Sequence, residues 1–109
     1  MAVITKADWK LFQQRIGGWQ EAYMERLNRQ YVALLSGQGL ASEKFWELEK
    51  RIREDKKTPG VRLLLQKSSV DRDLVALMRQ GVISAADLDG FSEELKEYVI
   101  SRAEWRDDL

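Results

Sequence analysis

The chain of 109 residues contains no cysteine and no histidine, and these two absences exclude most familiar catalytic centres. Without cysteine, the chain lacks disulfides, thiolate nucleophiles and zinc–thiolate sites. Without histidine, it lacks the commonest general base and most transition-metal sites. No P-loop, GxGxxG, GxSxG or HExxH pattern occurs either. We therefore expect no enzyme activity, no catalytic residue, no metal and no cofactor, and no small-molecule substrate is evident.

One short pattern, Asp87-x-Asp89-Gly90, invites a calcium-loop interpretation. If Gly90 is the sixth position of such a loop, Ala85 takes the first position and Lys96 the twelfth. Both positions need acidic oxygen ligands. The pattern fails that test, and a plain turn is the better interpretation.

The chain also lacks a long hydrophobic run and an excess charge of either sign. Its longest apolar run, Val61 to Leu65, is interrupted by Arg62, whereas a membrane span needs about 20 residues. Lysine plus arginine and aspartate plus glutamate number 18 each. We therefore expect a cytoplasmic protein with no membrane partner, for which nucleic acid is an unlikely ligand.

What is present is a long amphipathic pattern from Trp9 to Leu35. Its large apolar residues recur at steps of three and four, which is helical spacing. They are Trp9, Phe12, Ile16, Trp19, Tyr23, Leu27, Tyr31 and Leu34. Thr5 is the expected N-cap, with Asp8 completing a capping box. Gly17-Gly18 lies within the stripe and marks either a close approach by a neighbouring helix or a mild bend.

Four more helical segments are expected after this helix ends at Ser36-Gly37. Ser42 caps a helix that runs to about Lys56. Thr58-Pro59 begins a helix toward Gln80, which we expect to be kinked at 66–69. Alternatively, Ser68 caps a new helix there.

Gly81 ends that helix, and the last two segments follow it. Ser84 begins a short turn with Asp87 as its capping acid, and Ser92 caps a final helix. The sequence thus predicts a single all-α domain over 1–109, a small antiparallel bundle built on the long N-terminal helix, with a fraying tail over about 104–109.

The candidate interface residues are Trp9, Phe12, Ile16 and Trp46. A helix from about Lys6 to Leu35 would be roughly 45 Å long, which exceeds the diameter of about 34 Å expected for a compact chain of this size. We therefore expect its N-terminal end to overhang and to expose an apolar patch. A second copy would cover that patch, so the expected partner is a homodimer mate or another protein.

Parts of the chain resemble a family of small uncharacterised bacterial proteins. The resemblance covers roughly residues 8–97. It is carried by DWKLF (8–12), WQEAYMERLN (19–28), LLSG (34–37), KFWEL (44–48), DKK (55–57) and GVIS (81–84). Members are often labelled "multidrug transporter", which conflicts with the absence here of any segment able to span a bilayer.

Separately, residues 77–95 resemble the short C-terminal (SHOCT-type) helical hairpin appended to many bacterial proteins. That resemblance implies interaction or oligomerisation and transfers no functional residues.

The sequence is compatible with two functions. The first is a small cytosolic protein-interaction or self-association module. The second is a nucleic-acid-associated regulator that uses the helix-turn-helix-like segment over 70–100. Against the second stands the acidic candidate recognition helix, with Glu93, Glu94 and Glu97.

Overall fold

The computed structural model describes residues 2–104, and within them the chain forms four α-helices, two 3-10 turns and no strand. The α-helices are α1 (Lys6–Ser36), α2 (Ala41–Asp55), α3 (Val70–Arg79) and α4 (Glu93–Glu104), and the turns are η1 (Lys67–Ser69) and η2 (Ala85–Leu88). The predicted all-α class is confirmed. The predicted fraying tail falls, apart from residue 104 at the end of α4, outside the described residues.

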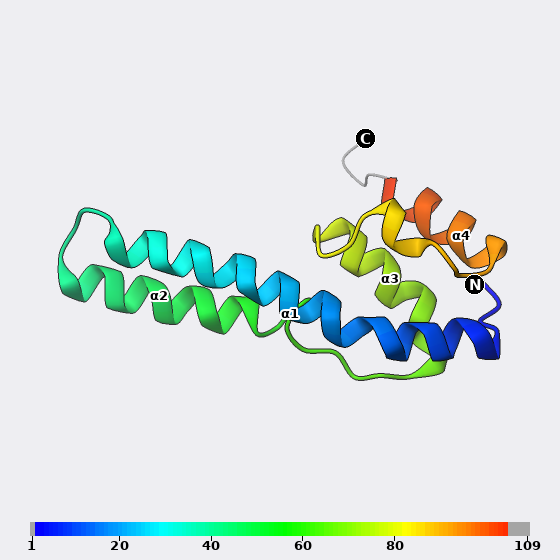
Figure 1. The fold of residues 1–109 in the computed structure, drawn as a ribbon. Helices are drawn as coiled ribbons and strands as arrows, with labels where there is room; N and C mark the ends of the chain where they lie inside the picture. The colour runs from blue at the N-terminus through cyan, green and yellow to red at the C-terminus, as the bar shows by residue number, and fades with distance from the viewer. Residues whose placement is uncertain (1, 105–109) are drawn as a thin grey trace.

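The molecule divides into two regions that share α1 (Figure 1). At one end, α3, η2 and α4 pack on the first half of α1, a region that we call the body. At the other end, α2 runs antiparallel to the second half of α1 and forms a projecting hairpin, the arm. The shape is elongated, with extents of 51 × 35 × 22 Å and a radius of gyration of 16.5 Å. A compact chain of this length would have a radius of gyration of about 13 Å.

The hydrophobic core lies in the body. Its buried members come from the first half of α1 and from the C-terminal third of the chain. They are Phe12, Ile16, Val70, Leu74, Leu77, Ile83, Leu88, Phe91, Leu95 and Val99. Trp9 and Trp19 are partly buried against this cluster. In the arm, only Leu27 is buried.

Helix α1 begins as the sequence predicts. The Thr5 side chain accepts from the backbone N–H of Asp8, and the Asp8 carboxylate accepts from that of Thr5. The helix is continuous through Gly17-Gly18, and a Cβ at either glycine would meet no other atom within 4 Å. The suggested close approach by a neighbouring helix is therefore wrong within the described chain.

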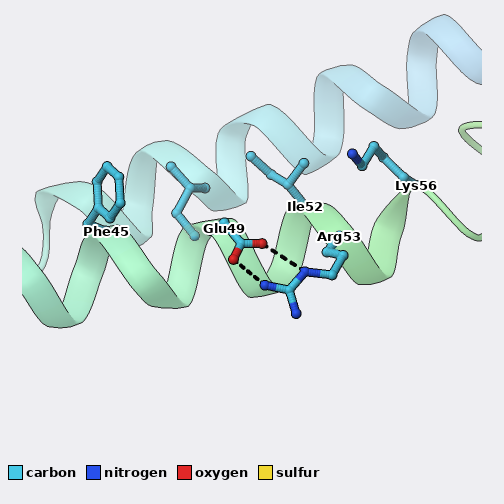
Figure 2. A pocket seen from close by; sticks show the side chains of 6 residues that line it. Phe45, Glu49, Ile52, Arg53 and Lys56 are labelled. Carbon is cyan, nitrogen blue, oxygen red and sulfur yellow. Dashed lines mark hydrogen bonds and ion pairs between the residues drawn. The ribbon is translucent and has the colours of Figure 1, made fainter.

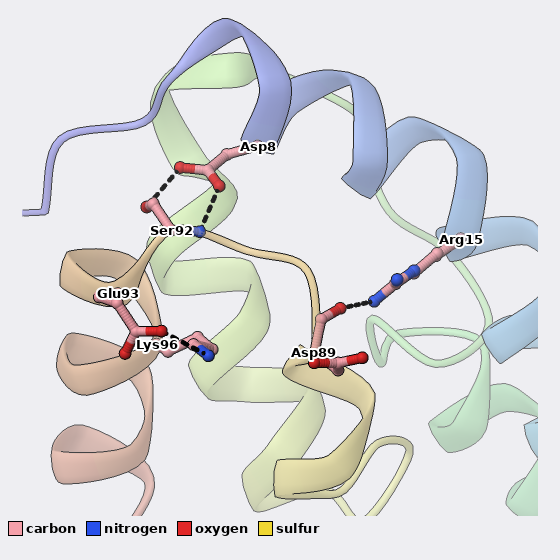
Figure 3. A network of polar contacts seen from close by, with 6 residues as sticks. All are labelled: Asp8, Arg15, Asp89, Ser92, Glu93 and Lys96. Atoms are coloured by element: carbon pink, nitrogen blue, oxygen red, sulfur yellow. Dashed lines mark hydrogen bonds and ion pairs between the residues drawn. The ribbon is translucent and has the colours of Figure 1, made fainter.

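The Asp8 carboxylate also joins α1 to the start of α4 (Figure 3). It accepts from the backbone N–H of Ser92 at 2.8 Å and from the Ser92 hydroxyl at 2.7 Å. Burial raises the pKa of Asp8, but the hydrogen bonds from Ser92 and Thr5 outweigh burial and hold the pKa below its ordinary value of 3.8.

The helix predicted from Thr58-Pro59 is wrong for its first part, because residues 58–66 form an irregular crossing segment and the α-helix begins only at Val70. The backbone of this segment is held by side chains of the helices that it crosses. Gln20 donates to the carbonyl of Pro59, and Gly60 donates to the Gln80 side chain. The alternative interpretation, a new helix that begins near Ser68, is closer to the structure, in which η1 and then α3 begin at Lys67 and Val70.

The next turns match their predictions. Gly81 follows α3 with a φ of 79°, which favours glycine. Ser84 and Asp87 form a capping box on η2. The Arg15 guanidinium donates to the carbonyl of Asp87. It also donates to the carbonyl of Asp89 (Figure 3), and the two bonds hold this turn against α1.

Candidate functional site

The predicted interface residues do not gather on one exposed patch. Phe12 is 0% exposed and Ile16 is 4% exposed, because α3 and α4 pack over the N-terminal half of α1. Trp9 is half-buried against the same core, where its ring stacks near that of Phe12. The prediction that Phe12 and Ile16 form an interface is therefore wrong. The end of α1 that extends past the body is its C-terminal half, which α2 accompanies.

Trp46 is the one predicted interface residue that lies well exposed, at 63%. It lies on α2 beside Phe45, which is 61% exposed, and the two rings meet edge to face with centroids 4.9 Å apart. The arm carries further exposed large apolar side chains: Val32, Leu35, Leu40 and Ile52. Most of the large exposed apolar residues of the described chain thus belong to the arm or its tip.

The two helices of the arm are joined by polar contacts along their line of contact. The Tyr31 hydroxyl donates to the carboxylate of Asp55, and Arg51 donates to the Gln30 side chain at 3.0 Å. Lys44 donates to the backbone carbonyl of Leu35 at 3.1 Å. Burial raises the pKa of Tyr31 to about 12, and the hydrogen bond and negative charge of Asp55 act in the same direction. These contacts hold the hairpin together without enclosing a core.

Helical spacing gathers the apolar side chains on one side of this hairpin. On α1 the steps are three, four and four, and on α2 they are three and four. We call this side the arm face; it consists of Met24, Leu27, Tyr31, Leu35, Phe45, Leu48 and Ile52. The opposite side of the arm carries Arg26, Glu47 and Glu54. The arm is therefore amphipathic as a pair of helices.

Two adjoining hollows run along the arm face. One, of about 330 Å³, lies beside Phe45, Leu48 and Ile52 (Figure 2). The other, of about 270 Å³, lies at the base of the arm between Met24, Tyr31 and the chain around Val61. Ile52 and Lys56 line both hollows, so these form one continuous groove.

The charged residues that line the groove all lie on α2 or directly after it: Glu49, Arg53, Asp55 and Lys56. Glu49 and Arg53 form an ion pair there (Figure 2), and Lys56 lies at the base. Both members of the pair are substantially solvent-exposed, so it contributes little to stability. An apolar floor with a polar rim is typical of a protein-binding surface.

The body leaves the arm face open. Arg26, on the polar side of the arm, donates to the carbonyl of Gly81 at 2.6 Å. The body therefore contacts α1 on the side away from Met24 and Tyr31. A partner could lie along the whole arm face without displacing α3 or α4.

Within residues 2–104, no group of three or more acidic side chains is arranged to hold a metal ion. No helix in the same range is both long and apolar enough to cross a bilayer. Comparison of the chain with protein-family models, with curated proteins and with solved structures gave no match.

Trp46 could be found from the sequence, but the arm face could not. The sequence does contain the apolar pattern of this face, since Phe45, Leu48 and Ile52 follow helical spacing. The same spacing describes a helix that buries its stripe in a core. Only the position of the body at the other end of α1 leaves this stripe uncovered.

Proposed function

We propose that this chain is a protein-interaction module that binds an apolar helical surface through its arm face. The observation that carries the proposal is the exposure of Phe45 and Trp46 beside a continuous apolar groove. An aromatic side chain buries about 150–250 Å² when it is enclosed. Covering the exposed parts of these two rings would therefore remove roughly 200–300 Å² from water.

The kind of partner follows from the shape and chemistry of the face. Two antiparallel helices form one layer, and a stable helical architecture needs a second layer over the apolar side. The groove between and beside helices accepts the side-chain ridge of another helix. Tyrosine, tryptophan and phenylalanine are also the residues enriched at the centres of interfaces. We include a cytoplasmic location in this proposal.

A binding measurement with a defined probe tests the proposal. The probe is a designed helix-turn-helix peptide with a leucine stripe, and its control is a peptide of the same composition in scrambled order. The chain, labelled on the body and kept at nanomolar concentration to limit self-association, is titrated with each peptide, and fluorescence anisotropy reports binding. We expect binding of the helical probe and a large loss of it with Phe45→Gln plus Ile52→Gln. Equal binding by the wild type and the double variant would refute the proposal.

The nucleic-acid alternative receives no comparable support. The exposed surface of α4 carries Glu93, Glu94 and Glu97, and these carboxylates repel phosphate. Lys96 on the same helix is paired with Glu93 at 2.9 Å (Figure 3). We therefore do not propose the 70–100 segment as a nucleic-acid-binding element.

A further inference from the structure

We infer that the partner of the arm face is the arm of a second copy, which lies antiparallel to the first and inserts Phe45 into the groove at the base of its mate. This inference rests on the proposed function and specifies the partner. The two arms together would form a four-helix bundle, with one body at each end. Two features of the described residues support this arrangement over others.

The first feature is that the arm face carries both a projecting side chain and a hollow to receive it. Phe45 projects near the tip of the arm. The hollow of about 270 Å³ lies at the base, lined by Met24, Leu27, Tyr31, Ile52 and Val61 among others. A two-fold interface uses the same patch twice, so it must be self-complementary. Antiparallel pairing brings each tip to the partner's base and fills both hollows.

Parallel pairing of the two arms would not place Phe45 in the hollow at the base. It would bring Phe45 against the partner's Phe45 and one base hollow against the other, so neither hollow would be filled. Unfilled apolar hollows forfeit packing contacts. Shape therefore favours the antiparallel pair.

In this arrangement Phe45 lies over the partner's groove beside Ile52 and Asp55, so the two-fold axis passes close to Glu49. The tip of one α2 then lies level with the base of the partner's α2.

The second feature is the area available. Helix α2 has 15 residues, which makes the arm about 22 Å long, and two helices are about 20 Å wide. The flat footprint is therefore about 450 Å² per copy. The accessible area is larger because side chains project from it, which places the pair near the lower end of standard interfaces of about 1,200–2,000 Å² in total. We accordingly expect a dimer that dissociates on dilution.

The test uses introduced cysteines, which are unique because the chain has none of its own. Ser42→Cys places a thiol near the tip of α2 and Lys56→Cys places one at the base, and neither change removes an apolar side chain of the face. The two variants are prepared separately, mixed under reducing conditions and then oxidised slowly. Glu47→Cys, on the polar side of the arm, is the matched control.

We expect a mixed Ser42→Cys with Lys56→Cys disulfide as the main cross-linked product, and little cross-linking of either variant alone or of Glu47→Cys. Disulfides within the Ser42→Cys variant alone and within the Lys56→Cys variant alone would indicate parallel arms. That result would overturn this inference while leaving the proposed function intact.

Molecular mass measured by sedimentation across a range of concentrations gives the second readout. We expect Phe45→Gln to shift the chain to the monomer, while Val3→Gln does not. Val3 has the same 61% exposure but lies before α1, away from the arm. A wild-type chain that stays monomeric at all concentrations would overturn the inference. Binding of the helical probe would then decide whether the proposed function survives.

Discussion

The body and the arm have similar kinds of helices but very different interiors. In the body, three segments surround the first half of α1, and ten apolar residues form one buried cluster. In the arm, two helices lie side by side, and Leu27 is their one buried apolar residue within the described chain. Two cylinders meet along a line, so each must leave most of its surface in water. Apolar residues placed on that surface stabilise the molecule only when something else covers them.

A buried polar contact of the body differs in the same way from the ion pairs of the arm. In the body, Asp8 is buried and its carboxylate accepts hydrogen bonds from two separate segments. The arm has the ion pairs Glu25–Arg29 and Glu49–Arg53. In each pair the two residues are one helical turn apart on an exposed helix surface. Pairs of that kind contribute little, because water screens them. Substitutions should therefore have large effects on stability in the body and small effects in the arm.

The largest expected effect comes from Phe12→Ala. Phe12 is fully buried in the body, and truncating a buried phenylalanine costs about 3–5 kcal/mol. Urea denaturation followed by circular dichroism measures the change. If stability is unchanged and the variant merely dissociates from a partner, Phe12 belongs to an interface and not to the core of the body.

A somewhat smaller loss is expected from Gly60→Ala at the junction of the two regions. An added Cβ would lie 2.5 Å from Tyr23 Cδ2 and 2.8 Å from Val82 Cγ2, so the crossing segment must shift. Overpacking of this kind costs about 1–3 kcal/mol. The matched control is Gly18→Ala, where nothing lies within 4 Å and helix propensity favours alanine by about 1 kcal/mol. A gain in melting temperature for both variants would contradict the close packing at Gly60.

Asp8→Asn should destabilise the body by about 1–3 kcal/mol at neutral pH, since the charged hydrogen-bond acceptor of Ser92 and Thr5 is lost. The pKa of Asp8 is lowered in the folded chain. Its contribution is therefore fully present above the unfolded-state pKa of about 4 and is lost as the pH falls through the folded-state pKa.

The measurement is the melting temperature of both proteins between about pH 7 and pH 2. We expect the difference between them to shrink as the solution becomes acidic. A difference that stays constant across that range would show that the charge of Asp8 does not matter to stability.

The smallest expected effect on stability comes from Phe45→Gln in the arm. The side chain is 61% exposed, and substitutions at such surface positions change stability by about 0.5 kcal/mol or less. Urea denaturation of the dilute monomer checks this value. A loss as large as that of Phe12→Ala would mean that the arm has an interior of its own, and the arm face would then be structural.

The sequence correctly predicted those features of the structure that depend on residues close together in the chain. The Thr5–Asp8 and Ser84–Asp87 capping boxes span only four residues each, and both formed. The apolar stripe of α1 correctly predicted one continuous helix, because its period does not depend on what packs against it. The all-α class followed from several such local signals that agreed with one another.

Two features depended on contacts between distant segments, and these only the tertiary structure decided. Residues 58–66 had a helix-start signal in Thr58-Pro59. The Gln20 side chain, however, donates to the carbonyl of Pro59, and the N–H of Gly60 donates to the Gln80 side chain, and these bonds hold the segment in its crossing path. The other feature is which half of α1 is covered. Periodicity identifies an apolar stripe but not what packs on it. Phe12 and Ile16 are core because the body packs on their half of α1, whereas Phe45 and Trp46, on the helix that accompanies the other half, remain exposed. That assignment depends on where α3 and α4 pack, about 60 to 90 residues away along the chain.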